Sequence, residues 1–171
     1  MAESLSEIRM LVLDVDGVLT DAGVYVAADG SDTKRFSIKD GLGIKIAMQA
    51  GLGVAIISGH ASEATVHRFR GLGVEEVIVG ATDKTGPFND LLQRHGLEAR
   101  QVAAMGDDLP DLPLLRAAGF AVTVPDAPEE VRDAADLVTQ RRGGDGAVRE
   151  IIECILKAQN RWGDVIARFE P

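Results

Sequence analysis

The chain has 171 residues, a length that predicts one domain over residues 1–171, and 46% of its residues are hydrophobic, which is enough for a substantial core. The formal net charge of −9 argues against a nucleic-acid partner, because the phosphate backbone favours basic surfaces. The first apolar run, residues 8–13, is too short to cross a membrane, and the N-terminus lacks a signal-peptide pattern. We therefore expect a cytoplasmic protein with no membrane partner. The single cysteine, Cys154, excludes an intramolecular disulfide.

Short apolar segments alternate with helical patterns along the whole chain. The expected strands are Met10–Asp14, Val54–Ser58, Val77–Val79, Val102–Met105 and Phe120–Val124. The expected helices are Gly41–Ala50, Ser62–Gly71, Lys84–Arg94, Leu112–Ala118, Pro128–Ala134 and Ala147–Arg161. This alternation predicts a parallel sheet covered by helices on both faces. With right-handed crossovers, the result is a three-layer, Rossmann-like α/β fold.

One stretch after the first strand departs from the alternation. Val24–Ala27 and Arg35–Ile38 flank Asp29-Gly30, a pair that is typical of a tight turn. We therefore expect a β-hairpin inserted at this place. No insertion is long enough to form a separate cap domain over the sheet.

Polar residues follow four of the expected strands. The first strand ends at Asp14, with Asp16 just beyond it, and the second ends at Ser58, with Gly59 and His60 after it; Lys84 follows the third strand and Asp107 the fourth. In open parallel sheets, ligands bind outside the carboxyl ends of the strands. Acids, a hydroxyl group and a lysine are therefore expected to meet at one edge of the sheet.

These residue types suit phosphoryl transfer. Asp14, at the end of a strand, can be held rigidly for in-line attack on phosphorus. Asp16 can protonate the leaving alkoxide and later deprotonate the water that hydrolyses an aspartyl-phosphate. Ser58 and the following amide can bond the phosphoryl oxygens, and Lys84 can offset their negative charge.

A divalent cation is expected among the acids. Carboxylates this close repel one another unless a cation lies between them. Asp14 and Asp107 offer the hard oxygen ligands that Mg²⁺ prefers, and the backbone carbonyl of Asp16 completes the predicted set. Magnesium would also reverse the negative field of this acidic protein locally, which an anionic substrate requires.

Each feature has a simpler interpretation when it is considered alone. An Asp-x-Asp sequence is often a turn or a cap, and a Ser-Gly pair after a strand is usually a turn. Lys84 alone would be a solvated residue in the first turn of a helix, and Gly106-Asp107-Asp108 alone would be a helix cap. The order of all four along the chain favours an enzyme. Whether His60 contacts the substrate is left open.

The run Asp14-Val15-Asp16-Gly17-Val18-Leu19-Thr20-Asp21 resembles the first motif of the haloacid dehalogenase superfamily. Ser58, Lys84 and Gly106-Asp107-Asp108-x-x-Asp111 match the second, third and fourth motifs in order. The resemblance implies a Rossmann-like fold, Asp14 as the nucleophile, Asp16 as the acid/base and Mg²⁺ as the cofactor.

Residues 34–43, the hairpin before them and residues 143–150 resemble the capless branch of that superfamily. This branch contains the 3-deoxy-D-manno-octulosonate 8-phosphate phosphatase family, which serves lipopolysaccharide biosynthesis. The resemblance implies hydrolysis of a small-molecule sugar phosphate by a homotetramer, in which hairpins form a barrel and one subunit covers its neighbour's site. Lys39 and Arg35 are then candidates for binding the substrate carboxylate or for subunit contacts.

The residue after the Ser-Gly pair departs from the family pattern. Octulosonate phosphatases usually carry Arg there and the related nine-carbon sugar acid phosphatases carry Glu, whereas this chain has His60. The leading expectation for the substrate is 3-deoxy-D-manno-octulosonate 8-phosphate, and a nine-carbon keto sugar acid 9-phosphate is the alternative. A non-catalytic oligomerisation domain is a further alternative, since such domains occur fused to nucleotide-sugar synthetases. A phospho-receiver domain fits less well, because it has its acids in a different order.

Overall fold

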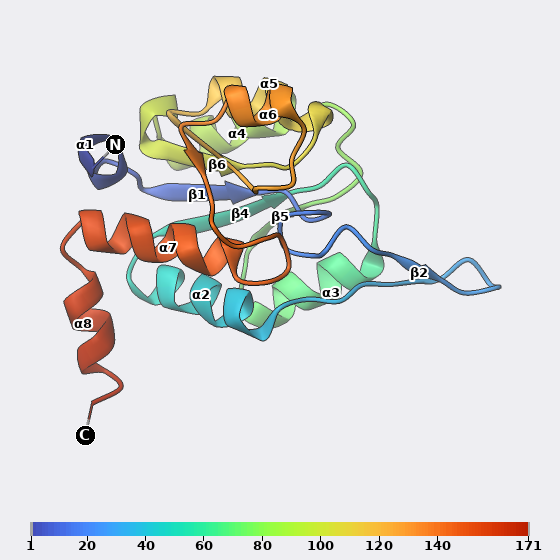
Figure 1. Ribbon diagram of the computed structural model, residues 1–171, viewed down its shortest axis with the longest axis horizontal. Helices are drawn as coiled ribbons and strands as arrows, with labels where there is room; N and C mark the ends of the chain where they lie inside the picture. The colour runs from blue at the N-terminus through green and yellow to red at the C-terminus, as the bar shows by residue number, and fades with distance from the viewer. Residues whose placement is uncertain (1, 171) are drawn as a thin grey trace.

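A six-stranded parallel sheet organises the computed structural model, which describes residues 2–170 (Figure 1). The strand order is β5-β4-β1-β6-β7-β8, so the first strand of the chain lies in the middle of the sheet. The strands are β1 (Met10–Leu13), β4 (Gly53–Ile57), β5 (Glu76–Ile78), β6 (Val102–Met105), β7 (Phe120–Thr123) and β8 (Leu137–Val138).

Helices cover both faces of this sheet. Figure 1 shows α2, α3 and α7 on one face and α4, α5 and α6 on the other. Their bounds, with those of the terminal α1 and α8, are α1 (Ala2–Ser6), α2 (Ile38–Gln49), α3 (Glu63–Leu72), α4 (Thr85–His95), α5 (Leu112–Ala117), α6 (Glu129–Asp133), α7 (Ala147–Ala158) and α8 (Trp162–Ala167). The expected three-layer α/β fold is confirmed, and no cap domain stands over the sheet among the described residues.

The core is mostly aliphatic, since only 4% of the residues of the chain are aromatic. All four residues of β1 are buried, because helices pack against both of its faces. Phe69 and Phe88 are the two aromatic rings among the largest fully buried side chains. The backbone of Asp14 continues the sheet beyond β1, since its N–H donates to the carbonyl of Met105 at 3.0 Å. The strand end that carries Asp14 is therefore rigid.

The loop between β8 and α7 supports the turn that follows β1. The buried carboxylate of Asp40 in α2 accepts hydrogen bonds from the backbone N–H groups of Gly146 at 3.1 Å and Arg149 at 2.8 Å. These bonds fix the start of α7. Gly143 in the same loop lies so close to Gly17 that a Cβ at position 143 would fall 1.7 Å from the Gly17 carbonyl oxygen.

The expected hairpin is present, but its predicted second arm was wrong. Strands β2 (Tyr25–Val26) and β3 (Asp32–Thr33) are antiparallel, with Tyr25 opposite Thr33, and Figure 1 shows β2 projecting from the body of the protein. The tight turn sets this register, because the carboxylate of Asp29 accepts from the backbone and hydroxyl of Ser31. The predicted arm, residues 35–38, instead leads into α2, whose N-cap is Ser37.

Several other elements also differ from expectation, among them the unpredicted helix α1. The long helix predicted over residues 147–161 ends at Ala158, and α8 follows as a separate helix after Asn160, which has a φ of 56°. Trp162 joins the two helices by stacking against the cations of Arg149 and Lys157. Strand β8 was not predicted, because two residues are too few for a recognisable pattern.

None of the described helices combines the length and apolarity that a membrane crossing requires.

Candidate active site

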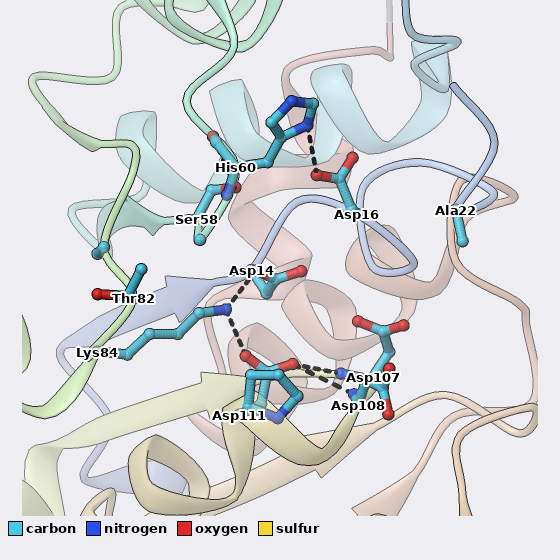
Figure 2. Close-up of a pocket in the computed structure, with 13 residues that line it drawn as sticks. Asp14, Asp16, Ala22, Ser58, His60, Thr82, Lys84, Asp107, Asp108 and Asp111 are labelled. Carbon is cyan, nitrogen blue, oxygen red and sulfur yellow. Dashed lines mark hydrogen bonds and ion pairs between the residues drawn. The ribbon is translucent and has the colours of Figure 1, made fainter. Parts of the chain in front are cut away.

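A cleft of about 480 Å³ lies at the carboxyl ends of the central strands (Figure 2). Seven of the nine predicted site residues line this cleft: Asp14, Asp16, Ser58, Gly59, His60, Lys84 and Asp107. Ala22, Ala81, Thr82, Asp108, Pro110 and Asp111 complete its lining. The sheet thus brings the four strand ends together as the sequence predicts.

Asp14 lies at the floor of the cleft and is buried. The ammonium group of Lys84 donates to its Oδ1 at 2.5 Å. Burial raises the pKa of Asp14 to about 7, and the negative charge of Asp111 adds to the rise, although Lys84 opposes it. Lys84 alone therefore does not keep Asp14 fully ionised at neutral pH, and further positive charge beside it would favour the carboxylate.

Asp111 shares Lys84 with Asp14, and Figure 2 shows the lysine between the two carboxylates. The other oxygen of Asp111 accepts from the backbone N–H groups of Asp107 at 2.9 Å and Asp108 at 3.3 Å. Burial alone would lower the pKa of Lys84, but the two carboxylates outweigh that effect and raise it. Asp111 therefore fixes both Lys84 and the loop after β6. The sequence shows it as part of a motif, but gives no sign that both of its oxygens are engaged.

The acids of the cleft fit a hard divalent cation. Asp14, Asp107 and Asp111 offer carboxylate oxygens that all lie within 4.8 Å of one another. Burial and the neighbouring charge of Asp14 raise the pKa of Asp107 to about 8, so one lysine does not balance the three acids. Because both oxygens of Asp111 are engaged, Asp14 and Asp107 are the better candidates for Mg²⁺ ligands. The predicted third ligand, the carbonyl of Asp16, stays a prediction.

Gly17 allows the loops after β1 and β6 to approach each other. Its φ of 93° lies in the left-handed region that favours glycine. A Cβ at this position would lie 1.9 Å from Oδ2 of Asp107. Any other residue would displace the carboxylate of Asp107 from the cleft.

Ser58 lies under the opposite wall of the cleft, with its hydroxyl close to the backbone of the next turn. The N–H of His60 donates to Oγ of Ser58 at 3.3 Å, and this hydroxyl lies 3.4 Å from the carbonyl oxygen of His60. The imidazole of His60 is exposed at the mouth, and its Nδ1 lies 3.7 Å from Oδ2 of Asp16, which is longer than a hydrogen bond. Whether His60 contacts the substrate stays a prediction.

Lys34, which contacts Asp16, was not among the predicted site residues. Its buried ammonium group donates to both oxygens of Asp16 at 2.8 Å. The residue follows β3 directly, whereas the second arm of the hairpin was expected to begin one residue later, at Arg35. A correct register for the hairpin would have turned attention to this lysine.

Arg35 and Lys39 do not line the cleft of this chain. The guanidinium of Arg35 lies 3.4 Å from the carboxylate of Asp21 and 3.5 Å from the carbonyl of Gly144. Lys39 lies on the first turn of α2 and lines a separate surface pocket of about 540 Å³ beside α7. Their predicted contact with substrate is not made within this cleft, and it stays a prediction.

Comparison with known proteins shows the family of the chain. The haloacid dehalogenase-like hydrolase family matches residues 73–151. A 3-deoxy-D-manno-octulosonate 8-phosphate phosphatase of Haemophilus influenzae is 40% identical over 94% of this chain and 89% of its own length. The corresponding protein of Escherichia coli K12 is 40% identical over 90% of this chain and 82% of its own length.

Solved structures are similar over the same range. The phosphatase of Moraxella catarrhalis, in complex with magnesium, phosphate and KDO, has a TM-score of 0.96 at 40% identity, and the match covers 99% of this chain and 97% of that one. The cobalt-bound phosphatase of Haemophilus influenzae has a TM-score of 0.89 at 41% identity, with 92% of each chain covered. The chain therefore belongs to the haloacid dehalogenase-like hydrolases and, within them, to the 3-deoxy-D-manno-octulosonate 8-phosphate phosphatase family.

Proposed function

We propose that this protein is a Mg²⁺-dependent phosphatase that hydrolyses 3-deoxy-D-manno-octulosonate 8-phosphate. One observation carries the proposal: a buried Asp14, paired with Lys84 and adjacent to Asp107, ends the central strand of a chain that is 40% identical to such phosphatases. The relative with bound magnesium, phosphate and KDO supports the choice of metal and substrate.

Asp14 is the nucleophile of this reaction. One of its oxygens attacks phosphorus, and the bond from phosphorus to the sugar oxygen breaks to give an aspartyl-phosphate. Lys84 fixes the carboxylate through its contact with Oδ1 and offsets charge on the transferring group. The hydroxyl of Ser58 and the N–H of Gly59 bond phosphoryl oxygens. When bound, Mg²⁺ neutralises the charge shared between the carboxylates and the phosphoryl group.

Asp16 moves the protons in both steps. Its carboxyl group gives a proton to the sugar oxygen as that oxygen leaves, so the sugar acid departs as an alcohol. The resulting carboxylate accepts a proton from water, and the hydroxide so formed attacks phosphorus. The bond from phosphorus to Asp14 breaks, phosphate leaves, and both aspartates return to their starting states.

The active form is a homotetramer in the cytoplasm that supplies a lipopolysaccharide sugar. Apolar side chains on the hairpin and the start of α2 support this assembly, because Tyr25, Val26 and Ile38 are 73%, 68% and 77% exposed. A neighbouring subunit would cover the cleft, which has no cap of its own, and exclude water from the reaction. Arg35 and Lys39 face the substrate carboxylate or the neighbouring subunit in this assembly.

A substrate panel tests the proposal. Purified protein with Mg²⁺ is assayed for phosphate release from the eight-carbon sugar acid 8-phosphate, a nine-carbon keto sugar acid 9-phosphate and simple hexose phosphates. We expect the highest kcat/KM with the eight-carbon substrate, and no release after Mg²⁺ is removed with a chelator. Preference for the nine-carbon substrate would overturn the substrate assignment. If the protein hydrolysed none of these substrates in the presence of Mg²⁺, the proposal that it is a phosphatase would be overturned.

A further inference from the structure

Lys34 is a fully buried lysine whose ammonium group points at the cleft from outside its lining. Its side chain has no exposed surface, and its hydrogen bonds among the described residues are the two to the oxygens of Asp16. A buried ammonium costs several kcal/mol unless it is paired with an opposite charge. Asp16 is therefore the counter-ion that this position requires, and the pair is built into the fold.

The backbone around Lys34 is held on both sides. Before it, Oδ2 of Asp32 accepts from the buried hydroxyl of Ser62 at 2.7 Å. After it, the ring of Phe36 packs edge-on against Phe69 of α3, with the centroids 5.4 Å apart. These contacts restrict the positions that the ammonium group can take. Lys34 is thus a fixed cation, unlike the exposed lysines of the helices.

Asp16 depends on this lysine for its orientation. Its side chain lies on the turn after β1 and is 34% exposed, and Lys34 alone among the described residues donates hydrogen bonds to it. The ring of His60, at 3.7 Å, is too distant to take over that role. Contact with both oxygens fixes the position of the carboxylate and the rotation of its plane.

We propose that Lys34 is the positioning residue of Asp16, holding its carboxyl group where it can give a proton to the leaving group and then accept one from water. The inference rests on the proposed function, because it assigns a role within that reaction. Lys34 is absent from the lining of the cleft, so it acts through Asp16 and does not touch the substrate. The hairpin segment therefore contributes to catalysis as well as projecting from the protein.

Lys34→Met tests the proposal, since it keeps most of the side-chain volume and removes the charge. Proton transfer by a positioned group contributes about 10²–10⁴-fold to rate, and misplacing that group loses a part of this. We expect kcat for the eight-carbon substrate to fall by about 10–100-fold, with KM changed by less than about threefold. Lys157→Met is the matched control, because Lys157 pairs with Glu153 on the exposed face of α7; its kcat stays at the wild-type value.

A double-mutant cycle separates positioning from a general structural effect. In an Asp16→Asn background, adding Lys34→Met is expected to cause no further loss of kcat, because the group through which Lys34 acts is already gone. Thermal unfolding of each variant checks that it is folded. Where Lys34→Met alone does not fold, the comparison of Asp16→Asn with the double variant, which removes both charges, decides the question.

Three outcomes overturn the inference while leaving the proposed function intact. They are an unchanged kcat in folded Lys34→Met, a further loss of kcat in the double variant, and a raised KM with unchanged kcat, which would make Lys34 a substrate-binding residue. A wild-type protein that hydrolyses no phosphate ester would instead remove the proposed function itself. Activity of the wild-type protein therefore distinguishes the two failures.

Discussion

The edge of the sheet and the β2–β3 hairpin place their side chains in opposite ways. At the sheet edge, charged side chains are buried: those of Asp14, Lys84 and Asp111 are at most 7% exposed. On the hairpin, the apolar side chains of Tyr25 and Val26 are exposed. Buried charge requires a counter-ion, and exposed apolar surface requires a partner. The sheet edge is therefore expected to bind a cation, and the hairpin is expected to pack against another protein molecule.

Asp14→Asn should abolish catalysis at the sheet edge while leaving assembly through the hairpin intact, which is the largest expected difference between the two regions. An amide cannot form the aspartyl-phosphate, so kcat falls by a factor on the order of 10⁴ or more. Lys84 keeps its pairing with Asp111, and the protein is therefore expected to fold and to assemble as the wild type does. Phosphate release together with gel filtration measures both effects. Residual activity within about tenfold of the wild type would exclude Asp14 as the nucleophile.

Gly143→Ala disturbs the sheet edge without touching a charged group. Its Cβ would fall 1.7 Å from the carbonyl oxygen of Gly17, so the turn that carries Asp16 must shift. We expect a loss of about 1–3 kcal/mol in the free energy of unfolding and of about 10–100-fold in kcat. Urea unfolding and phosphate release measure these changes.

The control for that substitution is Gly71→Ala in α3, where a Cβ would meet nothing within 4 Å. Alanine favours a helix over glycine by about 1 kcal/mol, so this variant should be slightly stabilised and fully active. If both variants behave alike, the contact between Gly143 and Gly17 does not position the catalytic turn.

The fold and the strand-end residues could be predicted because their pattern is local. A short apolar run such as β1, bounded by polar residues, indicates a buried strand, and a polar residue directly after it is then expected at the sheet edge. The hairpin register could not be predicted in the same way. Two-residue strands such as β3 have too short a pattern, and the turn around Asp29 sets the pairing.

The hydrogen-bond and ion-pair partners within the site could also not be predicted from the sequence. Lys84 was recognised by its place after a strand, whereas Lys34 comes from the hairpin, 18 residues after Asp16. Asp111 was seen as part of a motif, but its double role depends on a turn that brings its oxygens to two backbone N–H groups. Long-range contacts of this kind follow from tertiary packing, which one sequence does not display.

The stability of the metal-free protein should fall as the pH rises, because two acids at the sheet edge, Asp14 and Asp107, are buried close together. Unfolded carboxyl groups ionise near pH 4, but burial and mutual repulsion raise the pKa of Asp14 to about 7 and of Asp107 to about 8 in the folded state. Between about pH 4 and about pH 8 the folded protein binds more protons than the unfolded chain, so each increase in pH favours unfolding. Mg²⁺ binds the ionised carboxylates, so its stabilising effect should grow with pH.

Thermal unfolding at about pH 6 and about pH 8.5, with a chelator or with excess Mg²⁺, measures this dependence. We expect the chelated protein to lose on the order of 1–3 kcal/mol across this range, and Mg²⁺ to restore most of it. Asp14→Asn is the control, because it lacks one of the two groups and should show a shallower dependence. A chelated wild type that becomes more stable toward pH 8.5 would contradict the electrostatic account of the cleft.

The double substitution Tyr25→Ser and Val26→Ser should have the smallest effect on the subunit itself. Both side chains are exposed on a projecting hairpin, so the stability of the isolated subunit should change by less than about 0.5 kcal/mol. Light scattering should nevertheless show smaller particles than the wild type, and KM for the sugar acid phosphate should rise as the cleft loses its cover. Ile166→Ser, which removes an exposed apolar side chain from α8, should leave the particle size unchanged. A wild-type protein that is already monomeric would mean that the hairpin's apolar surface has another partner, and the two regions would then act independently.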